Sequence, residues 1–376
     1  AKPAIIYGMF VPGCELVDSK SLQQEESSPR DGDCLELVLV TTKGEIVRRQ
    51  VPGTNRREVL EQVSNFRRAV TNYSRPRAYR SPAKQFYQWL VSPLEEQLRL
   101  RGIDNLVYIL DEGLRSIPLA AMHDGEKFVI ETYSIGLMPS LSLTDTRHAP
   151  LRDLKVLAMG ASSFQDKRVS PLPGVPAELS LITEQLWSGK AYLNEAFTLN
   201  RVKQARDKIP FGIIHLATHG EFNAGEPANS FIQLWNDKLA LDQLRTLGWH
   251  NPPVELLILS ACRTALGNRE AELGFAGLAV AAGVKSALGS LWTVSDEGTL
   301  ALMTNFYQHL PTAPIKTEAL RQAQLSMMRG EVKLDEGNLV TPQGTIVLPN
   351  ELADLGSVPL THPYYWSGFT MIGNPW

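Results

Sequence analysis

The chain contains few cysteines and no long apolar run, and both absences narrow what it can be. Its 376 residues include three cysteines, Cys14, Cys34 and Cys262. They show neither an even disulfide framework nor C-x-x-C spacing, so we expect free thiols in a reducing, cytoplasmic compartment. No segment approaches the roughly 20 uninterrupted apolar residues that a membrane helix requires, and the apolar start at 4–7 carries no signal-peptide pattern. We therefore expect neither a disulfide-rich secreted domain nor a membrane protein.

Positive charge is not in excess either, so the chain offers no broad surface for nucleic acid or an anionic membrane. The net charge is −3, and 20% of the residues are charged. The one basic stretch, from Arg67 to Lys84, is interrupted by Pro76 and Pro82, which is typical of a solvated loop between two helices. Repeats of 20–50 residues and low-complexity tracts are absent. We expect no direct nucleic-acid or membrane partner.

Apolar sequence, in contrast, is plentiful, since 43% of the residues are hydrophobic. A chain of this length and composition can bury a sizeable core and is expected to fold as two units. The Ala149–Pro150 pair marks the boundary, which predicts subdomains at 1–150 and 151–376. The first residue is Ala1 rather than methionine, so we expect a processed chain or a piece of a longer protein.

Short apolar runs alternate with helical patterns along both predicted units. Strands are expected at 35–40, 45–47, 105–110, 154–160, 212–220, 254–262, 286–292 and 369–372, with a hairpin around 235–238. Helices are expected at 54–70, 177–187, 272–283, 300–310 and 317–328, from Leu241, and at 83–101 with an interruption at Pro93. This alternation predicts an α/β fold, with a mostly parallel sheet covered by helices on both faces.

Two of the apolar runs end on residues that can do chemistry together. One ends at His219, followed by Gly220, and the other ends at Cys262. In open α/β sheets, reactive groups collect just past the carboxyl ends of the strands. Neighbouring strands lie about 4.8 Å apart, so side chains at adjacent strand ends can reach hydrogen-bonding distance. Each residue alone is compatible with a structural role, but the pair at matching strand ends favours thiolate chemistry.

A cysteine peptidase needs a thiolate, a base and donors for the oxyanion. In this interpretation Cys262 is the nucleophile, and His219 is the base that later protonates the leaving amine. The backbone N–H groups of Gly220 and Cys262 are the two oxyanion donors, because a glycine lets its backbone approach the substrate carbonyl. This chemistry uses no cofactor, and none is expected.

His215 lies four residues before His219 and invites a metal interpretation. The H-E-x-x-H helix signature is absent, however, and no further histidine or carboxylate cluster completes a metal site. His215 also lies inside an apolar run. We therefore predict that His215 is a buried core residue and that no metal is bound.

Asp296 follows the apolar strand at 286–292 and should emerge at the same edge as His219 and Cys262. A carboxylate at the floor of a pocket selects lysine or, through a bidentate pair, arginine in a substrate. Asp and Ser residues just before a helix also commonly cap it, so both interpretations of Asp296 stay open. Glu297 and Asp242 are weaker candidates for the same pocket.

Five short motifs run along the chain in a specific order and spacing. They are DEGLRSIPL at 111–119, LATHG at 216–220, LSACRTA at 259–265, SLWTVSD at 290–296 and HPYYW at 362–366. Together they resemble the CHAT domain, a caspase-like (clan CD) cysteine peptidase module often found with tetratricopeptide repeats in bacteria. The resemblance covers nearly the whole chain. It implies a caspase-like fold, endopeptidase activity with His219 and Cys262 as the dyad, and a non-catalytic first subdomain.

Separases, a related group, carry a tryptophan followed by an aspartate in the same region, and there the acidic residue recognises arginine. By this resemblance Asp296 is a specificity residue. Thr293 departs from the pattern, because separases have an acidic residue directly after the tryptophan. The segment around Cys262 departs from the caspase Q-A-C-x-G form, so aspartate specificity is not implied.

These observations predict a cytoplasmic cysteine endopeptidase with a regulatory role, and cleavage after basic residues is one specificity compatible with it. Its expected partners are a protein or peptide substrate and either upstream tetratricopeptide repeats or an activating protein. The alternative is a catalytically silent caspase-like scaffold that binds partner proteins. A third hypothesis is a thiol transferase or amidase that acts on small molecules, for which a deep apolar pocket would be the sign.

Overall fold

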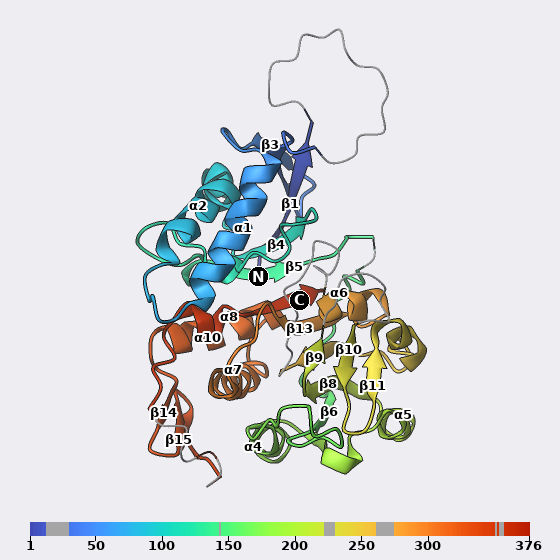
Figure 1. Cartoon of the computed structure of the whole chain (residues 1–376). Helices are drawn as coiled ribbons and strands as arrows, with labels where there is room; N and C mark the ends of the chain where they lie inside the picture. Colours follow the sequence, from blue (N-terminus) through green and yellow to red (C-terminus); the bar gives the residue numbers. More distant parts are fainter. Residues whose placement is uncertain (13–29, 143, 222–229, 261–273, 350–351, 353–356) are drawn as a thin grey trace. The chain divides into compact units, whose positions relative to one another are not determined.

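The computed structural model describes residues 1–12, 30–142, 144–221, 230–260, 274–349, 352 and 357–376. The chain forms two compact units, Ala1–Tyr133 and Ser134–Trp376 (Figure 1). The sequence analysis placed the boundary at residue 150 and assigned catalysis to residues 151–376. That assignment stays a prediction. Among the helices that the structure describes, none is both long enough and apolar enough to cross a membrane.

The first unit combines paired strands with a group of helices. Its strands pair in the order β3 (Ile46–Gln50), β2 (Cys34–Thr41), β1 (Pro3–Val11) and β4 (Asn105–Leu110). β1 is antiparallel to β2 and parallel to β4. The helices are α1 (Arg56–Thr71), α2 (Arg80–Leu90) and α3 (Glu95–Arg101), with a 3-10 turn at Ser92–Leu94 and two more at Leu119–Ala121 and Val129–Glu131. The predicted interruption at Pro93 is confirmed, because the 3-10 turn separates α2 from α3.

The sequence pattern of α1 explains how it packs. Val59, Val63, Phe66 and Val70 recur at helical spacing, and all four side chains are buried. Phe66 stacks on Phe86 of α2 with ring centroids 5.5 Å apart, so an apolar seam joins the two helices.

Cys34, on β2, corrects one expectation from the sequence. The residue is buried and disulfide-bonded, and its partner lies outside the described residues. The prediction of three free thiols is therefore wrong. An odd cysteine count rules out pairing of all three but not of two, and pairing depends on how closely the chain brings two Cβ atoms together rather than on sequence spacing. The inference of a reducing compartment loses its basis with it.

The second unit is built on a mostly parallel sheet. Its strands run in the order β5 (Ser134–Leu137), β17 (Phe369–Gly373), β13 (Ser286–Ser290), β12 (Leu256–Leu259), β8 (Phe211–Ala217), β6 (Lys155–Gly160) and β7 (Gly189–Leu193). The strands from β13 to β7 are parallel to one another, and β17 is antiparallel to β13. Every residue of β8, β12 and β13 is buried, which requires cover on both faces of the sheet. The predicted α/β fold is confirmed.

Helices and two small sheets complete this unit. The helices are α4 (Val175–Ser180), which continues into a π-helical turn at Leu181–Leu186, α5 (Leu199–Lys208), α6 (Gly274–Ala281), α7 (Asp296–His309), α8 (Lys316–Met328) and α10 (Pro363–Trp366), with 3-10 turns at Asn194–Ala196 and Leu241–Leu247. One small sheet joins β9 (Gly220–Glu221), β10 (Phe231–Gln233) and β11 (Lys238–Ala240), and the other joins β14 (Lys333–Asp335), β15 (Asn338–Thr341) and β16 (Gly344–Val347).

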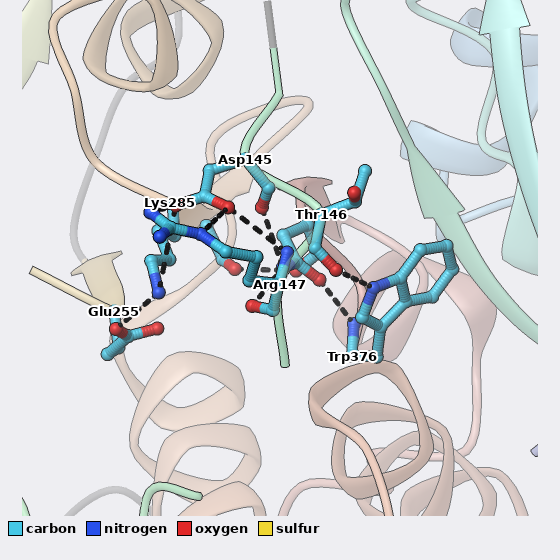
Figure 2. Close-up of polar contacts among 8 residues, drawn as sticks. Asp145, Thr146, Arg147, Glu255, Lys285 and Trp376 are labelled. Carbon is cyan, nitrogen blue, oxygen red and sulfur yellow. Dashed lines mark hydrogen bonds and ion pairs between the residues drawn. The ribbon is translucent and has the colours of Figure 1, made fainter. Parts of the chain in front are cut away.

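Ion pairs link neighbouring segments at the edge of the sheet where β12 and β13 begin. Lys285, just before β13, lies 2.7 Å from Glu255 and 3.9 Å from Asp145 (Figure 2). Close by, the indole N–H of Trp376 donates to the carbonyl oxygen of Thr146 at 2.7 Å (Figure 2). These contacts tie the segment after β5 and residue 376 to the amino ends of the strands. The carboxyl ends of the same strands lie at the opposite edge.

Candidate active site

The carboxyl ends of the parallel strands meet at one edge of the sheet, and the predicted site residues follow them. β8 lies between β6 and β12, with Ala217 opposite Gly160 and Leu216 opposite Leu259. His219 comes two residues after β8. Cys262 lies outside the described residues, and the strand that leads to it is described as far as Ser260.

A short antiparallel pairing holds the chain around His219. The backbone N–H of Gln233, on β10, donates to the carbonyl oxygen of His219 at 2.9 Å. The hydroxyl of Thr218 donates to the carbonyl oxygen of Gln233 at 2.6 Å. Hydrogen bonds to Gln233 therefore hold the backbone at Thr218 and His219 in place. The side chain of His219 is half-buried.

The imidazole of His219 is oriented by a backbone carbonyl. Its Nε2 lies 2.7 Å from the carbonyl oxygen of Ser170. A carbonyl oxygen can only accept, so Nε2 must carry the hydrogen, and in the neutral ring Nδ1 then has the lone pair. The buried ring of Phe164 lies 5.4 Å from the imidazole, measured between centroids. The carbonyl and the aromatic ring together orient the imidazole.

Gly220, the predicted oxyanion donor, stands at a particular place in the β9–β10 pairing. It is opposite Ile232, next to the hydrogen-bonded pair that His219 forms with Gln233. Hydrogen-bonded and non-hydrogen-bonded pairs alternate along an antiparallel ladder, so the N–H of Gly220 points away from β10.

Asp296 occupies the first residue of α7, and the helix is capped by its neighbour. The hydroxyl oxygen of Ser295 accepts from the backbone N–H of Gly298 at 3.2 Å. On its other side Asp296 approaches Gly174, where a Cβ would stand 3.7 Å from the Cβ of Asp296. Burial, followed by the charges of Glu297 and Glu178, raises the pKa of Asp296 to about 6. Among the described residues no cation pairs with this half-buried carboxyl.

One short loop links His219 to Asp296. Ser170 provides the carbonyl that orients the imidazole, and Gly174, four residues later, lies near Asp296. Four residues of extended chain span at most about 14 Å. The two predicted site residues, which are 77 positions apart in the printed sequence, therefore face the same loop.

His215 is fully buried, as predicted, but its partners were not anticipated. Its Nε2 lies 3.1 Å from a carboxylate oxygen of Glu178, and its Nδ1 lies 3.3 Å from the hydroxyl of Tyr307. Within the part of the chain that the structure describes, no group of three or more His, Cys, Asp or Glu side chains is placed to hold a metal ion. Of the weaker pocket candidates, Glu297 follows Asp296 on α7, whereas Asp242 lies exposed on the 3-10 turn at Leu241–Leu247.

The chain belongs to the CHAT domain family, whose model matches residues 80–374. The family predicted from the sequence motifs is thus confirmed. No curated protein matches the chain by sequence.

Solved structures with a similar fold include separase in complex with securin from Saccharomyces cerevisiae. Two such structures, at 3.0 Å and 2.6 Å resolution, each show 10% identity to this chain, with TM-scores of 0.56 and 0.53. The matches cover 100% and 99% of this chain but 30% of each separase chain, so the chain spans less than a third of that protein. At this identity the likeness concerns the fold.

A weaker likeness extends to bacterial proteinases. The complex of pro- and mature domains of Porphyromonas gingivalis RgpB is 11% identical, with a TM-score of 0.45, and the match covers 85% of this chain and 76% of that one. The Arg-specific cysteine proteinase gingipain R is also 11% identical, with a TM-score of 0.43 over 81% of this chain and 69% of the other.

Proposed function

We propose that this chain is a cysteine endopeptidase, a hydrolase of peptide bonds, in which His219 and Cys262 form the catalytic dyad. The observation that carries the proposal is the hydrogen bond from His219 to the carbonyl oxygen of Ser170. It orients a half-buried imidazole just past a strand end, with Nε2 as the donor. Membership of the CHAT domain family and the separase-like fold support the assignment.

The strand register supports the partnership of the two residues. Leu216 on β8 stands opposite Leu259 on β12. His219 comes three residues after the first, and Cys262 comes three residues after the second. Equal offsets beyond adjacent parallel strands favour an encounter at the same edge.

The chemistry then proceeds by acyl transfer. Nδ1 of His219 takes the proton of the Cys262 thiol, and the thiolate attacks the substrate carbonyl carbon. The N–H groups of Gly220 and Cys262 stabilise the oxyanion of the tetrahedral intermediate. The imidazolium, which the Ser170 carbonyl oxygen continues to orient, gives its proton to the leaving amine. Water, deprotonated by His219, hydrolyses the thioester and restores the thiol.

Asp296 is proposed to select a basic residue in the substrate. The carboxyl of Asp296 is half-buried, has a raised pKa and has no cation partner among the described residues. An incoming guanidinium or ammonium group would stabilise its ionised form. The capping interpretation is weakened because Ser295 accepts the capping hydrogen bond. Substrates are thus proposed to be proteins or peptides cleaved after arginine or lysine. Upstream tetratricopeptide repeats or an activating protein are the proposed regulatory partners.

Cleavage of a positional fluorogenic peptide library tests the proposal. The chain should cleave after arginine or lysine, and both Cys262→Ala and His219→Ala should remove more than 99% of the rate, since each deletes one half of the dyad. The exposed Ser163→Ala serves as a control for handling, with an unchanged rate. Equal cleavage by Cys262→Ala would exclude the dyad. Absence of cleavage, with partner-protein binding that survives in Cys262→Ala, would instead identify a scaffold.

A further inference from the structure

A side chain from the neighbouring strand fixes the start of the loop that follows β6. Gly160, the last residue of β6, stands opposite Leu193, the last residue of β7, so the chain leaves both strands at the same edge of the sheet. Asn194 comes next after β7. Its Oδ1 accepts from the backbone N–H of Ser162 at 2.9 Å, from the Ser162 hydroxyl at 3.2 Å and from the backbone N–H of Ser163 at 3.3 Å. One oxygen atom thus holds the first turn of the loop.

The same loop closes on itself and contains both groups that orient the imidazole. The backbone N–H of Leu172 donates to the carbonyl oxygen of Ser162 at 3.0 Å, which closes the loop at its base. Inside the closed loop, the carbonyl oxygen of Ser170 lies 2.7 Å from Nε2 of His219, and the ring of Phe164 lies 5.4 Å from the imidazole. Most of the side chains between these two groups are exposed, so packing contributes little to their placement. Their placement depends on the base of the loop.

The residue type at position 194 suits this task. Its φ is +51°, in the left-handed region where asparagine and aspartate are enriched among non-glycine residues. Glycine would adopt this turn with ease but offers no acceptor. A further hydrogen bond of the loop joins main-chain groups, the N–H of Gln165 and the carbonyl oxygen of Trp235 at 3.0 Å, and does not depend on the side chain. Oδ1 of Asn194 is therefore the part of the anchor that a substitution can remove.

We propose that Asn194 is a positioning residue for the catalytic base, because it fixes the loop whose Ser170 carbonyl orients the imidazole of His219. The inference rests on the role of His219 as the base of the dyad in the proposed function. Asn194 acts through the loop and not on the substrate. With the loop base held, Nε2 of His219 keeps the ring proton and donates it to the carbonyl oxygen. With the base loosened, the carbonyl no longer favours one tautomer, and the proton distributes over both ring nitrogens.

The tautomer of His219 is the direct readout, and its measurement requires no catalysis. The full chain is labelled with ¹⁵N-histidine, and long-range ¹H–¹⁵N NMR at pH 8.5 distinguishes protonated from unprotonated ring nitrogens, with His219→Ala as the reference for assignment. The parent should carry the ring proton of His219 on Nε2. Asn194→Gly removes the acceptor and keeps an easy left-handed turn, so both nitrogens should move toward an averaged shift. A melting curve checks that this variant folds.

Matched variants separate the loss of the acceptor from a general loosening of the fold. Asn194→Asp keeps an oxygen acceptor on a residue type that tolerates the left-handed turn, so it should retain the parental tautomer. Asn200→Ala removes an exposed asparagine from α5 and should leave the spectrum unchanged. In peptide cleavage, Asn194→Gly should lower kcat about 10- to 100-fold with little change in KM, because a base misplaced by about 1 Å slows the chemical step.

Two results would overturn the inference. One is a parental tautomer of His219 in folded Asn194→Gly, and the other is a loss of the tautomer in Asn194→Asp that is as complete as in Asn194→Gly. Both leave the dyad intact, since cleavage that depends on Cys262 and His219 would persist in the parent. Conversely, a tautomer that is lost in Asn194→Gly and kept in Asn194→Asp would support the positioning role even in a chain that never cleaves peptides, and in that case the peptidase would be refuted.

Discussion

Asp296→Asn should stabilise the fold while it weakens recognition of a basic substrate. The carboxyl is half-buried, has no described cation partner, and has a pKa raised to about 6 from an ordinary value of 3.8, chiefly by burial and then by Glu297 and Glu178. Because ionisation is harder in the folded chain than in the unfolded one, such a difference lowers the free energy of unfolding by about 3 kcal/mol once the pH is well above 6. Solvent around the partly exposed group reduces this to roughly 1–2 kcal/mol. Asparagine removes the charge and with it this cost.

The sign of the pH dependence follows from the same two pKa values. Below pH 4 the carboxyl is protonated in both the folded and the unfolded chain, so Asp296→Asn has little effect there. Between about pH 4 and pH 6 the folded chain retains a proton that the unfolded chain has lost. The stabilisation by asparagine therefore grows as pH rises through this window and is complete above about pH 7.

Calorimetry at pH 4.5 and pH 7.5 measures this effect. At pH 7.5 the melting temperature of the second unit should rise by roughly 2–8 °C in Asp296→Asn, because 1 kcal/mol corresponds to about 2–4 °C for a unit of this size. At pH 4.5 the gain should be much smaller. Glu184→Gln, an exposed carboxylate on the neighbouring helical turn, is the control and should change neither value. A variant that is equally or less stable than the parent at pH 7.5 would refute the reasoning.

Three further predictions concern the same edge of the sheet. The ratio of kcat/KM for an arginyl substrate to that for its citrullyl counterpart should fall about tenfold from pH 7 to pH 5, because a carboxyl with a pKa of about 6 is mostly protonated at pH 5; a flat ratio would exclude Asp296 as the selecting group. Gly160→Ala would place a Cβ 2.5 Å from the carbonyl oxygen of Ala217, so it should cost about 1–3 kcal/mol in urea unfolding and slow cleavage, and an unaffected rate would contradict the role of this strand end. Trp292→Phe leaves the carbonyl of Tyr364 without its indole donor and should cost roughly 1–3 kcal/mol by the same assay, which an unchanged unfolding midpoint would disprove.

The sequence predicts the sheet well because the strands are apolar on both faces. β8 and β12 each appear as a continuous apolar run, and their order within the alternation of strands and helices leads to a parallel sheet. The interruption at Pro93 is equally local, since proline removes a donor and clashes with the preceding turn. Such features depend on a few neighbouring residues, and the sequence contains them in full.

The parts that the sequence misses depend on contacts between distant segments. The group that orients His219 is a backbone carbonyl, that of Ser170, and a backbone carbonyl leaves no mark in the residue type. Glu178 and His215 give a weak signal, because each is a lone polar residue in an apolar segment. Their pairing across 37 positions appears only when α4 packs on β8. The disulfide of Cys34 was missed for the same reason.

The most direct test of the central claim is covalent labelling of the dyad. The chain is incubated with an arginyl acyloxymethyl ketone, from which a thiolate displaces the carboxylate leaving group to form a thioether, and the adduct is located by peptide mass spectrometry. The account predicts one adduct per chain, on Cys262, lost in His219→Ala and reduced in Asp296→Asn. An adduct on another residue, or labelling of Cys262 that is as fast in His219→Ala as in the parent, would contradict it.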